Sequence, residues 1–143
     1  MKTVTIYTDG ACRGNPGLGG WGALIQFGKF KKEIYGGETS TTNNKMELKA
    51  TINALKAMKE PCDITLYTDS KYVIQGIENW IHNWKKKKWI GANKKPIKNM
   101  DLWKELDELR LEHNIKWIWV KGHSGDPGNE TADMLANRGI DEL

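Results

Sequence analysis

Two aspartates follow runs of matching character in this chain. Asp9 comes directly after the apolar and β-branched run 3–8, Asp69 comes directly after the similar run 64–68, and a small residue follows each. Neighbouring strands of a sheet lie about 4.8 Å apart, so the two carboxylates would meet if these runs paired in parallel. Two anions that close repel each other unless a cation lies between them. The pattern predicts a metal ion at the ends of two strands, where open α/β sheets keep their sites.

Two further acids, Glu47 and Asp133, fall in the first turns of predicted helices, and alanines stand beside both. Oxygen ligands without histidine or cysteine partners favour Mg²⁺ or Mn²⁺ over zinc. Together with Asp9 and Asp69, these acids are enough to hold two ions about 4 Å apart. One ion would activate a water, and the other would stabilise the leaving oxygen of a phosphodiester.

Each acid taken alone also has an ordinary structural explanation. Glu47 and Asp133 could simply interact well with a helix dipole, and Asp9 and Asp69 could cap turns. Capping does not explain why both strand-like runs finish alike, and this match favours the metal site.

The periodicity of the chain predicts the element order β-β-β-α-β-α-α-β-α. Strands are predicted over 3–8, 21–27, 31–35, 64–68 and 115–120. Helices are predicted over 43–58, from residue 70 onward, around 102–109 and over 129–139. A glycine-rich loop is expected over 10–20 and a connection over 36–42. Short turns indicate an antiparallel meander, and intervening helices indicate parallel strands. We therefore expect an α/β fold with a mixed five-stranded sheet flanked by helices.

The bulk properties of the chain predict a single domain over residues 1–143. Its two cysteines suggest no disulfide framework, and its first residues run straight into a strand pattern without a signal peptide. No apolar stretch is long enough to span a membrane. We expect a cytoplasmic protein and, because no interface stripe stands out beyond the core pattern, a monomer.

The positive charge of the chain is concentrated in one segment. The net charge is +4, and residues 80–98 hold seven lysines and no acid. Tryptophans stand at 80 and 84, directly before these lysines. Such a basic segment is typical of a surface that contacts a phosphate backbone. The alternative is a solvated lysine-rich face over a small tryptophan cluster.

With these residues in view, the chain resembles the bacterial type 1 ribonucleases H over nearly its whole length. The likeness rests on the segments Tyr7–Gly17, Thr41–Leu48, Thr68–Ser70, Trp80–Lys86, Trp119–His123 and Asn129–Asp133. The four acids, the string from Thr41 to Leu48 and the Gly122-His123 pair make the resemblance specific when they occur in this order.

The resemblance implies endonucleolytic cleavage of the RNA strand in an RNA/DNA hybrid by two Mg²⁺ ions, with Mn²⁺ as a substitute. The products would carry 3′-hydroxyl and 5′-phosphate ends, and sequence specificity would be low. The implied metal ligands are Asp9, Glu47, Asp69 and Asp133. His123 would assist in proton transfer or product release, although a loop histidine can also be a solvated surface residue.

A nuclease that selects hybrids must recognise 2′-hydroxyl groups, and neutral amides suit this because they both donate and accept hydrogen bonds. The resemblance places Cys12, Asn15, Asn43 and Asn44 along the RNA strand. It places Thr42 at a phosphate of the DNA strand. An ordinary turn at Asn15, an ordinary helix start at Asn43 and an N-cap at Thr42 are the structural alternatives.

Lys71 departs from the family pattern, because relatives often carry glutamine there. We expect a charged phosphate contact in place of a neutral 2′-hydroxyl contact. Within the basic segment, Trp80 and Ile81 are expected to pack inward, and Trp84 is expected to face the DNA strand. The substrate contacts expected from this segment are Trp80, Trp84, Lys85, Lys86, Lys87 and Lys88.

Two alternatives belong to other functional classes. The first is a binding module that holds hybrids without cutting them, and the intact acids argue against it. The second is another nuclease or an integrase with the same fold, and the asparagines that suit 2′-hydroxyl recognition argue against that one.

Overall fold

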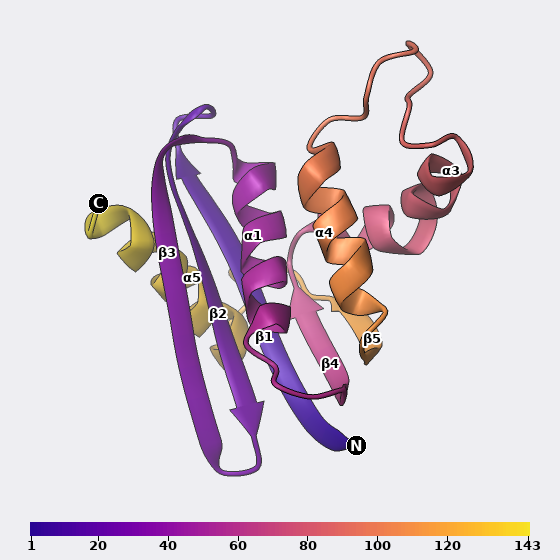
Figure 1. Ribbon diagram of the computed structural model, residues 1–143. Coiled ribbons are helices and arrows are strands. Elements are labelled where there is room, and N and C mark those ends of the chain that lie inside the picture. Colours follow the sequence, from indigo (N-terminus) through magenta and orange to yellow (C-terminus); the bar gives the residue numbers. More distant parts are fainter.

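A computed structural model describes residues 1–143 and contains one five-stranded mixed sheet in the order β3-β2-β1-β4-β5 (Figure 1). The strands are β1 (Lys2–Arg13), β2 (Gly17–Phe27), β3 (Phe30–Thr41), β4 (Cys62–Thr68) and β5 (Asn114–Trp119). The first three pair antiparallel, β4 pairs parallel with β1, and β5 pairs parallel with β4. The predicted combination of an antiparallel meander and parallel additions is confirmed.

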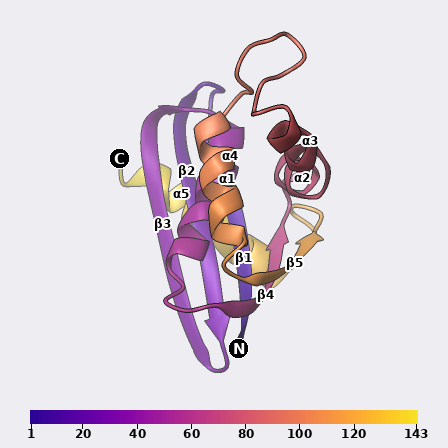
Figure 2. The same cartoon turned by 45° about the vertical axis from the view of Figure 1, so that its right-hand side comes forward.

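Helices lie on both faces of this sheet (Figures 1 and 2). They are α1 (Asn43–Lys56), α2 (Lys71–Gln75), the π-helical turn η1 (Gly76–Trp80), α3 (Ile81–Lys86), α4 (Met100–Arg110) and α5 (Pro127–Asp141). The helices α1 and α4 cover one face, whereas α5 crosses behind β1, β2 and β3. The segment between α3 and α4 projects away from the sheet as a long loop. No helix has the length and apolar character needed to cross a membrane.

The main core fills the space between the sheet and the helices in front of it. Alternate residues of β4, among them Ile64 and Leu66, point into this core, as the period of a strand requires. Leu48 and Leu55 of α1 meet them from the helix side, and both are fully buried. This packing sets the distance between α1 and the middle of the sheet, where the candidate site lies.

The predicted loop over 10–20 is wrong, and so is the predicted connection over 36–42. β1 runs on to Arg13, β2 begins at Gly17, and β3 continues to Thr41. The glycines permit close packing instead of a loop: a Cβ on Gly20 would lie 2.0 Å from the carbonyl oxygen of Ala136 on α5. A glycine-rich strand that lies directly against a helix has the same composition as a loop.

The helical stretch that begins after Ser70 is interrupted by the π-helical turn. Gly76 is the first residue of this turn, and a Cβ there would lie 2.0 Å from the ring of Trp103. Trp103 is fully buried, whereas Leu102 and Leu109 are only partly buried. The apolar face predicted for the helix around 102–109 is therefore rotated, because the large indole fills the space that the glycine leaves open.

Candidate active site

Asp9 and Asp69 are neighbours, as the paired runs predict. β1 and β4 pair in parallel with Thr8 opposite Thr68, and the residue that follows each of these threonines is an aspartate. One detail of the prediction is wrong: Asp9 lies inside β1, opposite Gly22 of β2, and not at the end of its strand. β1 continues past the end of β4 because β2 still pairs with it. The two carboxylates therefore lie at the carboxyl end of β4, beside a point within β1.

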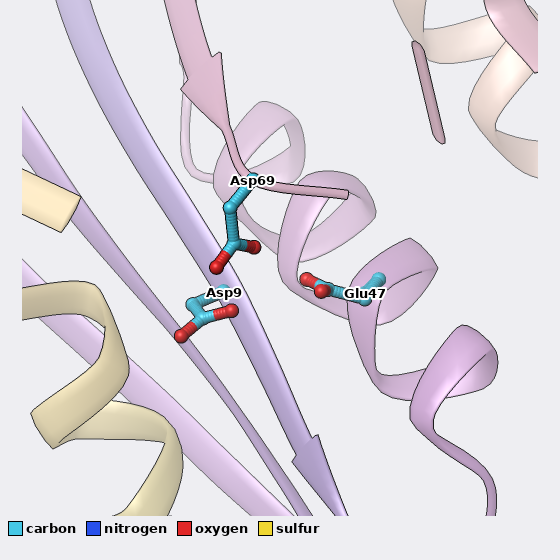
Figure 3. A group of neighbouring side chains, drawn as sticks. All are labelled: Asp9, Glu47 and Asp69. Carbon is cyan, nitrogen blue, oxygen red and sulfur yellow. The ribbon is translucent and has the colours of Figure 1, made fainter. Parts of the chain in front are cut away.

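Glu47 reaches the same place from α1. Its helix is capped by Thr42, whose hydroxyl accepts a hydrogen bond from the Lys45 amide at 3.3 Å. The helix lies almost against β1, since a Cβ on Gly10 would sit 2.5 Å from the Glu47 nitrogen. Glu47 lies beyond the predicted first turn, in which α1 has no acid. Its side chain points toward Asp9 and Asp69 (Figure 3).

The three carboxylates form a tight group. Asp9, Glu47 and Asp69 each offer an oxygen atom, and these atoms lie within 4.8 Å of one another. Asp9 is only 4% exposed and Glu47 only 5%. Asp69 is partly buried. Three acids this close, two of them buried, are costly in isolation, and a divalent cation between them would offset the repulsion.

Asp133 lies beside this group on α5. It lines the same cavity and is partly buried, but it stands outside the tight group of three. The prediction that it lies in the first turn of its helix is wrong, because α5 begins at Pro127 and its first-turn acid is Glu130. Asp126 caps the helix through the Asn129 amide at 2.9 Å, and this earlier start places Asp133 deeper along the helix.

Two tyrosines on the back of the sheet link the elements that carry these acids. The rings of Tyr7 and Tyr67 stack with centroids 4.8 Å apart and an interplanar angle of 12°. A Cβ on Gly128 would lie 2.4 Å from the Tyr7 ring, so the first turn of α5 rests directly on that ring. β1, β4 and α5 are thus held together two residues before Asp9 and two residues before Asp69.

Burial and mutual repulsion keep protons on this site. Burial first, and then the charge of Asp69, raise the pKa of Asp9 to about 9. Burial, followed by the charges of Asp9 and Asp69, also raises the pKa of Glu47 well above its usual range. Without a cation, the site therefore binds protons at pH values where exposed carboxyl groups are fully ionised.

These shifts predict how stability depends on pH in metal-free buffer. Between about pH 4 and pH 9 the folded protein holds more protons than the unfolded chain, so raising the pH lowers the free energy of unfolding. One extra proton held by the folded protein costs about 1.4 kcal/mol per pH unit, so from pH 5 to pH 8 we expect Asp9→Asn to gain about 4 kcal/mol of stability relative to the unchanged protein. Urea denaturation of both proteins in EDTA measures this difference. A constant difference, or one that shrinks with pH, contradicts the prediction.

The chemistry of the site fits a hard divalent cation. All donors in the tight group are carboxylate oxygens, as Mg²⁺ and Mn²⁺ prefer. The Oε1 atom of Glu47 is buried and has no hydrogen-bond partner in the protein. A buried polar atom without a partner is costly, and a cation bound there would satisfy it.

The acids open into a cavity of about 570 Å³. Its further lining includes the expected residues Cys12, Asn43, Asn44, Lys71 and His123. Ser70 and Tyr72 also line it and were not predicted, although their position next to Asp69 and Lys71 is a signal that could have found them. The cavity therefore brings the acids together with neutral amides and one lysine.

The comparison with known families agrees with this geometry. A model of the RNase H family matches residues 1–141 of this chain. The chain belongs to the ribonuclease H family. It is thus an endoribonuclease of the hydrolase class, in a family that cleaves the RNA strand of RNA/DNA hybrids, and the resemblance described above is confirmed.

Individual relatives support the assignment. A ribonuclease H of Alcanivorax borkumensis is 62% identical over 143 residues, which are 100% of this chain and 95% of the relative. The crystal structure of LC9-RNase H1, a type 1 RNase H with the type 2 active-site motif, is 30% identical with a TM-score of 0.90, covering 99% of this chain and 73% of that one. A foamy viral protease-reverse transcriptase in complex with an RNA/DNA hybrid shares the fold, with a TM-score of 0.82 and 21% identity, over 99% of this chain and 20% of that one.

Asn15 and Thr42, which are also expected to contact the substrate of a ribonuclease H, do not line the cavity but hold the start of α1, whose residues Asn43 and Asn44 do. The Asn15 side chain accepts a hydrogen bond from the Asn43 amide at 3.1 Å, which ties the β1–β2 turn to the start of α1. Thr42 is the N-cap of α1, so its structural alternative is realised. A hydroxyl that accepts one hydrogen bond can still donate one to a phosphate, and the substrate roles of both residues stay predictions.

The basic segment of this ribonuclease H is attached to the core by its tryptophans. The ring of Trp84 is partly buried and packs 5.3 Å from the buried ring of Trp103 and 5.8 Å from that of Trp80, and its expected contact with the DNA strand stays a prediction. Lys85 forms an ion pair with Asp107 at 3.0 Å. The aromatic surface of the segment is used to attach it to α4, and apolar burial outweighs exposure for an indole.

The remaining expectations for this segment fit the structure. Ile81 is fully buried, and Trp80 is partly buried beside Tyr72. Lys86, Lys87 and Lys88 are exposed. These three lysines are available to phosphate groups, whereas Lys85 must first leave Asp107.

Proposed function

We propose that Asp9, Glu47, Asp69 and Asp133 hold two Mg²⁺ ions, and that this centre hydrolyses the RNA strand of an RNA/DNA hybrid to 3′-hydroxyl and 5′-phosphate ends. The observation that carries the proposal is the tight group of three carboxylates, two of them buried, with an unpartnered Glu47 oxygen. Asp133, at the side of this group, would complete the set.

The ions supply two effects when bound: a nucleophilic water at neutral pH and stabilisation of the charge that develops on the leaving oxygen. The protein residues provide the frame. Asp9 and Asp69 are fixed by the parallel pairing of their strands, and Glu47 by the close contact of α1 with β1. A rigid frame of this kind fixes the carboxylates before the substrate arrives, which is the main contribution of protein to such catalysis.

His123 is proposed to assist proton transfer or product release. It is exposed, lines the cavity and adopts a φ of 57°, in the left-handed region that a non-glycine residue rarely occupies. Its position at the rim allows it to exchange protons with solvent while reaching toward the acids.

Selection of hybrids is proposed to rest on neutral groups that line the RNA strand. Asn43, Asn44 and Cys12 lie next to the acids, where amide and backbone groups can donate to and accept from a 2′-hydroxyl. Lys86, Lys87 and Lys88 would contact phosphates of the DNA strand. Because these contacts reach sugar and phosphate and no base edges, we expect little sequence preference.

A panel of substrates tests this function. A labelled RNA/DNA hybrid is incubated with the protein and Mg²⁺, and duplex DNA, duplex RNA and single-stranded RNA serve as controls. We expect cleavage of the hybrid alone, replacement of Mg²⁺ by Mn²⁺ with retained activity, and no cleavage in EDTA. Equal cutting of duplex DNA would refute the substrate assignment, and hybrid binding without turnover in Mg²⁺ would indicate a binding module.

We further propose that residues 1–143 act as one domain and as a cytoplasmic monomer. Both cysteines, Cys12 and Cys62, are free thiols, which suits a reducing compartment. Light scattering coupled to gel filtration should give a mass near the chain mass of 16.3 kDa. A mass twice as large would refute the monomer.

A further inference from the structure

Trp119 holds the backbone at Asp69. It is the last residue of β5, and its indole Nε1–H donates a hydrogen bond to the Asp69 carbonyl oxygen at 3.0 Å. The neighbouring Val120 amide donates to the Thr68 carbonyl at 2.9 Å. These two hydrogen bonds attach the end of β5 to the end of β4, next to the Asp69 side chain. Trp119 is nevertheless 42% exposed. A tryptophan kept only for its apolar area would be more deeply buried.

The exposed face of the same indole carries Lys71. The Lys71 ammonium lies 4.9 Å from the centroid of the Trp119 ring, within the range of a cation–π interaction. Lys71 is the only lysine or arginine that lines the cavity, where four carboxylates also lie. It forms no ion pair with an acid, so its charge is available to a ligand.

We propose that Trp119 is a positioning residue that fixes Asp69 through its N–H and Lys71 through its ring. The ligand of Lys71 is a backbone phosphate of the nucleic acid next to the bond that is cut. This inference rests on the function proposed above and adds Trp119 to the machinery of the site.

Charge explains why a phosphate is the ligand. An acidic cavity repels a phosphodiester backbone, and a single ammonium at its rim lowers this repulsion where the chain enters. Lysine acts as a point charge that suits a phosphate oxygen, and it lacks the acceptor that a 2′-hydroxyl reader needs. An ammonium already held by a ring loses less side-chain entropy when it binds.

The first test measures how hybrid binding depends on salt. The affinity of a labelled hybrid is determined in EDTA at several NaCl concentrations for the unchanged protein, for Lys71→Gln and for Lys29→Gln. Lys29 is an exposed lysine in the β2–β3 turn and serves as the matched control for loss of one charge. Loss of one phosphate contact should reduce the slope of log Kd against log salt by about 0.7–0.9 for Lys71→Gln and leave it unchanged for Lys29→Gln.

The second test separates the two roles of Trp119. Trp119→Phe keeps a ring but removes the N–H, so the binding of Mn²⁺ measured by calorimetry and the value of kcat should each fall about tenfold, with KM nearly unchanged. Trp119→Leu also removes the ring and should raise the Kd for the hybrid about threefold. In the Lys71→Gln background, Trp119→Leu should not weaken hybrid binding further, because the ring then has no cation to hold.

The outcomes distinguish this inference from the proposed function. If the unchanged protein neither binds nor cuts the hybrid, the proposed function fails. If it does both, but Lys71→Gln keeps the full salt slope or the effects of the Lys71 and Trp119 changes simply add, the phosphate contact is refuted. Unchanged Mn²⁺ affinity in Trp119→Phe refutes the role of the indole N–H.

Discussion

Asp9→Asn is expected to lower the rate of hybrid cleavage by about 10³-fold or more while the affinity for the hybrid stays within about threefold. The amide removes one negative charge and one ligand oxygen from the tight group of three carboxylates. Binding rests mostly on phosphate contacts outside this group, so it should survive. The contrast between the two quantities makes the change informative.

Single-turnover cleavage in saturating Mg²⁺ measures the rate, and fluorescence anisotropy in EDTA measures the affinity. Asp63→Asn is the matched control, because Asp63 lies at the opposite end of β4 and accepts a hydrogen bond from the Asn114 side chain that an amide oxygen can also accept. The control should cut at the unchanged rate. If Asp9→Asn cuts as fast as the control, the carboxylates do not form the metal centre.

Trp103→Ala is expected to reduce the free energy of unfolding by about 3–5 kcal/mol. The indole is fully buried, its ring packs against Tyr72 and Trp84, and its N–H donates to the Tyr72 hydroxyl at 3.0 Å. Truncation leaves a cavity against Gly76, which has no side chain to fill it. The helices α2 and α3, together with the basic segment, would lose their main contact with α4.

Equilibrium urea denaturation of Trp103→Ala tests this expectation, with Trp103→Phe as the control. Phenylalanine keeps a ring in the same space and should lose clearly less, about 1–2 kcal/mol, because only part of the volume and the hydrogen bond disappear. The alanine variant should also bind the hybrid more weakly at temperatures where it is folded, because the basic segment is no longer anchored. A loss below 1 kcal/mol for alanine would contradict the packing described here.

Local patterns predicted much of the secondary structure but misplaced several boundaries. The alternation in β4 and the helical spacing in α1 gave correct elements, because each of them buries one face against the same core. The glycines of β2 wrongly predicted a loop. They allow β2 to lie close to α5, which comes more than a hundred residues later in the chain. No sequence window contains that contact.

Local periodicity also could not predict which way the tryptophan side chains point. Trp84 and Trp103 could each face water or the core on helical spacing alone. Gly76 decides the outcome, because it opens a space that one indole fills and against which the others then stack. A contact between η1 and α4 is a property of the folded chain.

The sequence by itself determined which atoms are available for chemistry: oxygen ligands in place of nitrogen or sulfur, neutral amides, and a concentrated run of lysines. The functional group that each side chain carries is set by its residue type, and folding does not change it. The tertiary structure alone decided that Asp9, Glu47 and Asp69 meet within 4.8 Å, that two of them are buried enough for their pKa values to rise, and that Trp119 connects Asp69 with Lys71. Distance and burial depend on strand register and on how closely helix and sheet approach, and both arise only when segments far apart in the chain pack together.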